Sequence, residues 1–245
     1  MMSIWGVRLA FCAVIIAAIA IGLFRVDMIG FRVPLLAVAA SVLIAVIALL
    51  FSGIGIFNDI VSKTASVSPV LRGLAIIGAL LLAVPGISAL RSGMSSPPIH
   101  DVSTDPDDPP LFEFVMADRR ASDNSLELDA AVIAQQREAY PELSSVRLQL
   151  PIDQAAEKIR ASIAAQGWKI LGDRKLGADA PSEVQIEAVA RTRIFGFRDD
   201  LAFRLRSLGE AETLLDIRSA SRVGISDLGA NARRVTGFID TLTLP

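Results

Sequence analysis

Three long apolar stretches dominate the first ninety residues. They run from about Ile4 to Phe24, from Val33 to Phe51 and from Leu71 to Ala89, and each is close to the roughly 20 residues that a helix needs to cross a hydrocarbon core of about 30 Å. The pattern predicts three transmembrane helices. None of the three stretches has a charged side chain at its centre, and this argues against an ion or proton path.

The chain changes character near residue 92. Five prolines lie between Ser92 and Pro110 together with an acidic run beside His100, and this composition predicts an extended linker over 92–110 that is either solvated or lies along the protein surface. The acidic run lacks the spacing and the closing Glu of a calcium loop, so it predicts no metal site. We therefore expect a membrane domain (1–91), a linker (92–110) and a soluble domain (111–245).

The soluble domain combines helical and alternating patterns. Apolar residues recur at helical spacing from Ile152 to Ile163, and a shorter helix is expected over 126–140. A final helix is expected from about Asp227 to Leu242, with an apolar stripe of Leu228, Ala232, Val235, Ile239 and Leu242. Alternation predicts strands at 146–150, 168–172, 183–193, 201–208 and 213–222. The order β-α-β-β-β-β-α is typical of an α+β fold, with an antiparallel sheet, both helices on one face and the other face left polar.

Strand parity gathers six arginines on the face of the sheet that lacks the helices. Leu201, Phe203 and Leu205 share one side of their strand, so the residues between them point to the other side. The six are Arg191, Arg193, Arg204, Arg206, Arg218 and Arg222, and they face Glu187 and Asp216. Two interpretations stay open: cross-strand salt bridges on a solvated face, which the pattern favours, or a platform for a phosphate or carboxylate partner.

Composition narrows the classes of function. Of 245 residues, 52% are hydrophobic and 20% are charged, and the mean hydropathy is +0.52. Only 7 of the first 90 residues are charged, against 43 of the last 155. One Cys, one His and one Tyr argue against a disulfide framework, a Cys/His zinc site and a His-based triad. We expect no catalytic residue, no metal, no cofactor and no nucleic-acid partner.

Charge counting does not decide the membrane orientation. Three basic residues flank each side of the predicted spans: Arg8, Lys63 and Arg72 on one side, and Arg25, Arg32 and Arg91 on the other. The acidic segment after the third span favours a cytoplasmic N-terminus. We therefore expect an integral protein of the bacterial inner membrane with a periplasmic C-terminal domain.

Three stretches of the soluble domain resemble a known family. They are residues 98–105, which begin Pro-Ile-His-Asp, residues 196–204, which begin Gly-Phe-Arg-Asp-Asp, and residues 217–231, Ile-Arg-Ser-Ala-Ser-Arg-Val-Gly-Ile-Ser-Asp-Leu-Gly-Ala-Asn. Through them the last 150 or so residues resemble the domain of unknown function 1499, found in bacterial envelopes and plastids. The resemblance implies an extracytoplasmic domain and supplies no activity, ligand or catalytic residue. Its motif residues in this chain are Asp199, Asp200, Ser219, Ser221, Arg222, Ser226, Asp227, Gly229 and Asn231.

The motif residues also have a plain structural interpretation. Ser226 or Asp227 is suited to cap the final helix, and a capped start is favoured over an open anion site because Asp227 would itself occupy the positive end of the helix. Asp199 and Asp200 are neighbours in a strand, so we expect their side chains to face opposite sides of the sheet.

Three functional hypotheses follow. The leading one is a non-enzymatic, membrane-anchored binding or assembly module whose arginines face an anionic partner, either lipid headgroups or an acidic protein. The alternatives are a His-independent, hydrolase-like enzyme built on Asp and Ser groups, and a purely structural membrane subunit. An enzyme requires those groups to converge in one concave pocket, whereas a platform requires the arginines to be exposed. The oligomeric state is not specified by the sequence.

Overall fold

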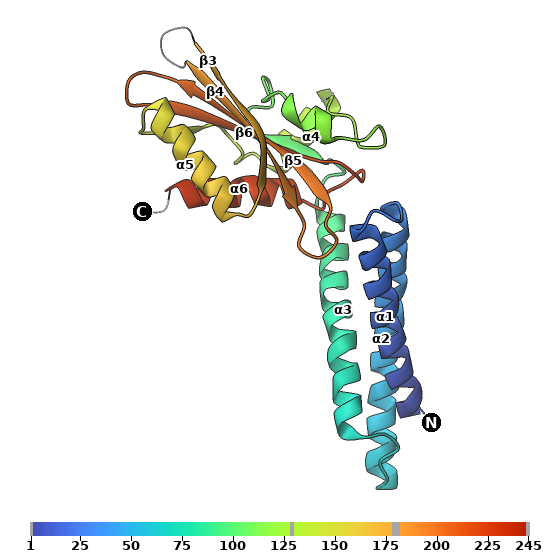
Figure 1. Ribbon diagram of the computed structural model, residues 1–245. Coiled ribbons are helices and arrows are strands. Elements are labelled where there is room, and N and C mark those ends of the chain that lie inside the picture. The colour runs from blue at the N-terminus through green and yellow to red at the C-terminus, as the bar shows by residue number, and fades with distance from the viewer. Residues whose placement is uncertain (1, 128–129, 178–181, 244–245) are drawn as a thin grey trace. The chain divides into compact units, whose positions relative to one another are not determined.

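The protein forms two compact units, Met1–Met94 and Ser95–Pro245 (Figure 1). The computed structural model describes residues 2–127, 130–177 and 182–243. The helical N-terminal unit and the C-terminal domain are each built around a buried cluster of their own.

The N-terminal unit contains the three predicted apolar helices: α1 (Met2–Arg25), α2 (Arg32–Ser62) and α3 (Pro69–Ser95). All three are long and apolar enough to cross a membrane, which is consistent with an integral membrane protein. Each is longer than the predicted span. At 1.5 Å per residue α2 extends for about 46 Å, well beyond a hydrocarbon core of about 30 Å. The helix therefore continues through residues 52–62, beyond the predicted span.

Helices α1 and α2 approach each other closely through small residues. A side chain on Gly6 would place its Cβ 2.6 Å from Ser52 Oγ, and one on Gly55 would place its Cβ 2.7 Å from the backbone of Ser3. Without a hydrophobic driving force between helices in lipid, contact of this kind supplies the van der Waals attraction that holds the pair together. Glycine is required at both positions because the two backbones leave no room for a side chain.

The C-terminal domain is an α+β fold built on an antiparallel sheet of six strands. The strands are β1 (Asp101–Ser103), β2 (Val146–Leu148), β3 (Lys169–Leu176), β4 (Glu183–Arg191), β5 (Arg198–Ser207) and β6 (Thr213–Ser221). Strands β3 to β6 form a meander, and the short β1 and β2 both pair with the outer edge of β6. The predicted order of strands and helices from residue 146 onward is confirmed.

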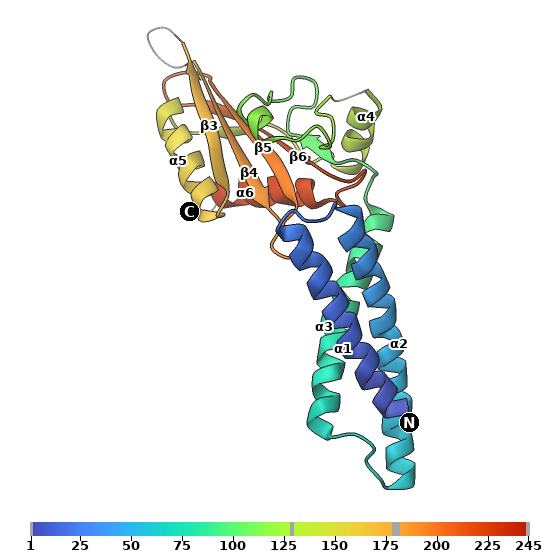
Figure 2. The ribbon, with the colours of Figure 1, turned by 45° about the vertical axis from the view of Figure 1, so that its right-hand side comes forward.

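One face of the sheet holds the apolar core, under α5 (Ile152–Ala165) and α6 (Ala230–Thr243). Figures 1 and 2 show both helices on this face. Phe203 from β5 meets Phe238 from α6 with ring centroids 4.9 Å apart, and Trp168 stacks on Phe238 at 5.5 Å. The predicted stripe on α6 included Ile239, which is only partly buried, whereas Phe238 is fully buried.

The opposite face is polar, as expected, but it is not left open to solvent. Residues 104–127, which we call the covering segment, lie over it and include a 3-10 helix η1 (Phe114–Asp118) (Figure 2). Helix α4 (Ala130–Ala139) forms within the predicted range 126–140, of which residues 128–129 lie outside the described residues. Its Gln136 bonds both the backbone N–H and the carbonyl of Ser103 and so extends the pairing of β1.

The predicted linker at 92–110 needs correction. Residues up to Ser95 continue α3, and Asp101–Ser103 is a fully buried edge strand that pairs with β6. The acidic run, expected to be solvated or to lie along the surface, binds arginines of the sheet, because Arg204 and Arg206 would otherwise share the single carboxylate of Asp216.

Candidate functional site

The arginines of β5 and β6 lie on the covered face of the sheet, as the alternation predicts. The register pairs Arg204 with Asp216 and Ala202 with Arg218, while Phe203 and Ile217 share the core side. The arrangement beneath the covering segment is a layer of ion pairs in three groups, centred on Asp216, Arg218 and Arg222.

Asp216 is the centre of the first group. Its fully buried carboxylate accepts hydrogen bonds from Arg204 at 3.1 Å and from Arg206 at 2.7 Å. Both arginines also reach the covering segment, where Asp105 lies 3.2 Å from Arg204 and 3.3 Å from Arg206. Arg204 adds a bond of 2.9 Å to Asp108. The group therefore ties the acidic run of the covering segment to the middle of the sheet.

Arg218 is the centre of the second group. It donates to both carboxylate oxygens of Asp101, the shorter bond being 2.7 Å, and to the backbone carbonyls of Pro110 and Leu126. Its guanidinium lies over the ring of Phe112, 4.8 Å from the centroid. Burial raises the pKa of the Asp101 carboxyl above its ordinary value, against the opposing effect of Arg218. This pair joins β1 to β6 and also holds the covering segment.

Arg222 and Asp200 form the third group. Two nitrogens of Arg222 donate to one oxygen of Asp200 at 2.9 and 2.7 Å, and Arg119 of the covering segment donates to the other oxygen. Arg222 also lies 3.0 Å from Asp118. Burial alone would lower the pKa of the Arg222 guanidinium, but its hydrogen bonds and the charge of Asp200 raise it overall.

The six predicted arginines therefore divide into two sets. Arg204, Arg206, Arg218 and Arg222 belong to the layer of ion pairs, whereas Arg191 and Arg193 lie at the end of β4 and beyond it and are exposed. Asp216 is a salt partner, as expected. Glu187 is instead fully buried and accepts the backbone N–H groups of Glu113 and Val115 at 2.8 and 2.9 Å, which fixes η1 to the sheet.

A second polar cluster lies on the core side of the sheet at the start of α6, and it contains the other motif residues. Ser219 donates to Asn231 at 2.7 Å, and the Asn231 amide donates to Ser221 and to the backbone carbonyl of His100. Arg234 donates to Ser219 and, through a second nitrogen, to Asp199. Burial raises the pKa of the Asp199 carboxyl, and the nearby charge of Arg234 opposes that shift.

The start of α6 is capped. Asp227 accepts the backbone N–H groups of Gly229 at 2.9 Å and Asn231 at 2.6 Å, and Ser226 accepts that of Leu228 at 3.2 Å. Leu228 and Gly229 both have positive φ, 57° and 76°, which directs their N–H groups toward these acceptors. The carboxylate of Asp227 thus occupies the place where an external anion would bind.

Asp199 and Asp200 face opposite sides of the sheet, as predicted. Asp199 bonds Arg234 on the core side, and Asp200 bonds Arg222 and Arg119 beneath the covering segment. Two carboxyl groups separated in this way cannot share a substrate or a proton. In the described part of the chain, no group of three or more His, Cys, Asp or Glu side chains is arranged to hold a metal ion.

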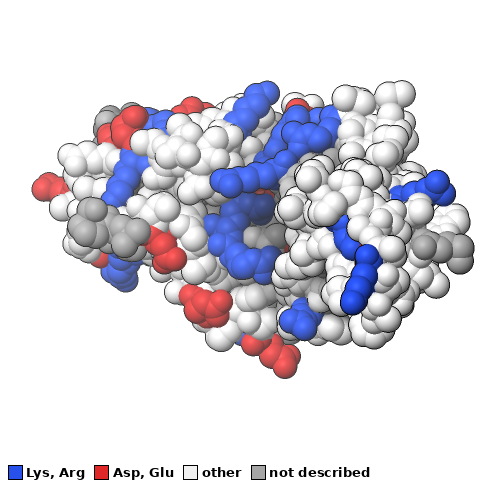
Figure 3. Space-filling model, turned by 90° about the horizontal axis from the view of Figure 1, so that it is seen from below, with Lys and Arg blue, Asp and Glu red and all other residues white. Residues whose placement is uncertain are grey.

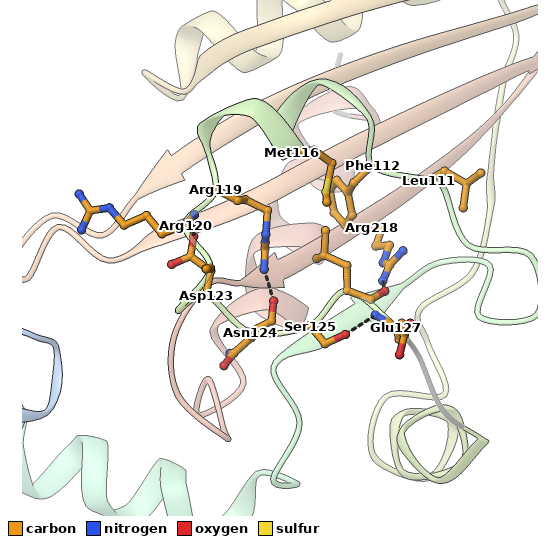
Figure 4. A pocket seen from close by; sticks show the side chains of 12 residues that line it. Leu111, Phe112, Met116, Arg119, Arg120, Asp123, Asn124, Ser125, Glu127 and Arg218 are labelled. Carbon is orange, nitrogen blue, oxygen red and sulfur yellow. Dashed lines mark hydrogen bonds between the residues drawn. The ribbon is translucent and has the colours of Figure 1, made fainter.

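A pocket of about 610 Å³ opens in the covering segment (Figure 4). Its apolar lining includes Leu111, Phe112 and Met116, and Arg218 rises beside Phe112 at one end. Figure 4 also shows Arg119 directed at the backbone of Asn124. The remaining lining residues are Arg120, Ala121, Asp123, Ser125, Leu126 and Glu127.

Sequence reasoning found Arg218 but missed the rest of this pocket. Residues 111–127 show neither alternation nor a helical period, because the segment is held by its contacts with the sheet and not by its own pattern. The sequence did contain one indication of these contacts, because the predicted sheet face has more arginines than carboxylates. Six arginines facing two predicted carboxylates indicate further acidic partners, and the run from Asp101 to Asp108 supplies them for Arg204, Arg206 and Arg218.

No curated protein and no solved structure matches this chain. The family model described as "Protein of unknown function (DUF1499)" matches residues 101–242, which is more than half of the chain and includes β1 to β6, the covering segment and nearly all of α6. The chain therefore belongs to the DUF1499 family, through its C-terminal domain, and it carries three apolar helices ahead of the matched region.

Proposed function

We propose that the protein is a non-enzymatic, membrane-anchored binding module, and that the pocket in the covering segment takes an anionic ligand with an apolar tail. The observation that carries the proposal is the pairing of exposed apolar side chains with arginines in one hollow. Leu111 and Met116 are both exposed at the pocket, and Arg119, Arg120 and Arg218 line it. A site that is mostly apolar with a few convergent polar groups is the usual form of a small-ligand pocket.

The arginines differ in what they offer a ligand. Arg218 and Arg119 are bound to Asp101 and Asp200, so they shape the floor and hold it rigid. Arg120 is exposed and lines the pocket, and its planar guanidinium suits a carboxylate or phosphate. The ligand head is therefore expected at Arg120 and the tail along Met116 and Leu111.

The polar groups of the second cluster support binding over hydrolysis. Asp199, Ser219, Ser221 and Asn231 are buried and are bonded to one another or to Arg234. Their donors and acceptors serve the junction of β6 and α6, and the Asp200 carboxylate lies on the far side of the sheet. This arrangement fits a structural role for the motif.

We also propose that the three helices anchor the chain in the bacterial inner membrane with the C-terminal domain in the periplasm. Three spans place the two chain ends on opposite sides of the membrane. The acidic segment after α3 favours the periplasmic side, because basic residues are enriched in cytoplasmic loops. A reporter that is active only in the cytoplasm, fused after Pro245, should be silent, and strong activity would reverse the orientation.

The pocket is tested on the full chain in lipid nanodiscs with a photoactivatable long-chain carboxylate. We expect crosslinks within residues 111–127, and they should weaken in Arg120→Gln and Met116→Asp. Arg147→Gln is the matched control because it removes an exposed arginine from β2, outside the pocket. Crosslinks that are absent from 111–127, or that persist unchanged in both pocket variants, would contradict the proposal.

A further inference from the structure

The turn between β4 and β5 presents an apolar side chain to solvent in a rigid frame. Ile194 at the turn is 63% exposed. Three hydrogen bonds of 2.9 Å close the turn: Thr192 N–H to the Phe197 carbonyl, Gly196 N–H to the Thr192 carbonyl, and Phe197 N–H to Thr192 Oγ1. Phe195 and Phe197 stack on each other at 5.0 Å. The isoleucine is therefore held outward by the backbone.

A second exposed isoleucine lies at the same end of the sheet. Ile225, in the connection from β6 to α6, is 81% exposed. The two loops are neighbours because Asp199 pairs with Ser221, and the Arg222 N–H donates to the Arg198 carbonyl at 3.1 Å. Two large aliphatic side chains on adjacent loops form an apolar tip that the fold of this domain does not bury.

The charged side chains on the 192–197 turn and its flanking residues are all basic. Residues 191–198 contain three arginines and no Asp or Glu, and Arg191 and Arg193 are both exposed. Figure 3 shows the charged side chains on one face of the whole molecule, with Lys and Arg in blue. A bilayer with acidic lipids has an apolar interior beneath anionic headgroups. Isoleucine and phenylalanine suit the apolar interior, and the arginines beside them suit the headgroups.

The chain also enters the domain at this end. The Pro97 carbonyl accepts a hydrogen bond from Ser226 Oγ at 3.2 Å, and the Ile99 carbonyl accepts one from the Asp227 N–H at 3.1 Å. Pro97 follows Ser95, the last residue of the apolar helix α3, by two positions. Two residues of extended chain span only about 7 Å, so a lipid surface that holds the end of α3 is within reach of the residues around Pro97.

From these observations we infer that the 192–197 turn and Ile225 form a docking surface for anionic phospholipids. Ile194 and Ile225 enter the interface between headgroups and acyl chains, and Arg191 and Arg193 bind the phosphate groups. Docking would limit the freedom of the domain at the membrane surface. This inference does not depend on the ligand proposed for the pocket in the covering segment.

The test uses the full chain in nanodiscs, with Cys12→Ser removing the only natural cysteine. An environment-sensitive fluorophore on Ile194→Cys should shift to the blue in phosphatidylglycerol-containing discs relative to phosphatidylcholine discs. The shift should reverse at about 1 M salt, where the Debye length falls to about 3 Å. Replacing Arg191 and Arg193 by Ser should weaken docking by about fivefold for each charge removed.

Leu208→Cys is the matched control. Leu208 is 44% exposed and lies in the β5–β6 connection, at the other end of the sheet from the 192–197 turn. Its fluorophore should report water in both kinds of disc. The inference is overturned if the label at 194 is as water-exposed as the label at 208 in anionic discs, or if it enters neutral and anionic discs equally. In a Trp5→Phe background, Trp168 fluorescence verifies that each labelled protein is folded, because that ring is packed against the core of the domain.

Discussion

Asp101 and Arg218 form an ion pair of 2.7 Å whose side chains are only 3% and 4% exposed, and it joins the first strand of the C-terminal domain to the last. A pair this deep has given up almost all of its hydration. Its two members therefore depend on each other far more than the partners of a surface salt bridge do.

Arg218→Met should lower the free energy of unfolding by about 3–5 kcal/mol, because it leaves the Asp101 carboxylate buried without its partner. The measurement is denaturant unfolding of the full chain in mild detergent, followed by Trp168 fluorescence in a Trp5→Phe background. The double variant Asp101→Leu/Arg218→Met should recover much of the loss, since no charge remains buried. A loss in the double variant equal to the sum of the losses in Arg218→Met and in Asp101→Leu would show that the pair is not coupled.

Phe238→Ala should cost about 3–5 kcal/mol, because the ring is fully buried between Trp168 and Phe203. Ile239→Ala, on the neighbouring position of α6, should cost clearly less because Ile239 is only partly buried. The same unfolding assay compares the two variants. The reverse order would mean that α6 presents a different face to the sheet.

This contrast on α6 illustrates how far sequence patterns reach. In β5 the alternation of Leu201, Phe203 and Leu205 predicted both the strand and the side of the sheet that each residue faces. Side chains of a strand alternate between the two faces, so only two assignments are possible. On α6 the stripe is broader than one row, so Ile239 and Phe238 could not be separated by spacing alone. The strand Asp101–Ser103 was missed because three residues among prolines carry no period at all.

Asp227→Ala should destabilise the domain by about 1 kcal/mol, because two N–H groups at the start of α6 lose their acceptor. Asp227→Asn keeps one acceptor oxygen and should lose less. Thermal unfolding of both variants measures the difference. If the alanine variant is as stable as the wild type, water or another side chain must satisfy these N–H groups.

Glu187 gives the stability of the domain a pH dependence. Burial raises the pKa of its carboxyl above the ordinary value of 4.5, against the effect of the N–H groups that it accepts. The folded state therefore keeps a proton at pH values where the unfolded state has lost it, so stability should fall as the pH rises from about the ordinary value through the folded pKa.

Glu187→Gln should make this fall in stability smaller, and the measurement is the slope of unfolding free energy against pH in the acidic range. Part of the slope should remain because burial also raises the pKa of Asp101 and Asp199. The quantity to compare is the slope, since the glutamine amide alters the bonds to Glu113 and Val115 at every pH. Identical slopes in the two proteins would exclude Glu187 as a source.

The candidate site was less predictable than the fold. The pattern identified which arginines share a face, but their partners come from Asp101, Asp105 and Asp108, about a hundred residues earlier in the chain. No local rule connects such distant positions. The pocket depends on the path of the covering segment over the sheet, and that path is fixed by long-range bonds such as those to Glu187.

The pairing of β1 with β6 also sets the order in which the domain can be completed during synthesis. Asp101 leaves the ribosome 117 residues before Arg218, so the first strand must wait without its partner while nearly the whole domain is made. The β3–β6 meander can form earlier from neighbouring hairpins, whereas the covering segment can dock only onto a finished sheet. The segment that directly follows the last apolar helix is therefore the last to be locked, and a chain truncated before β6 would leave it unpaired next to the membrane.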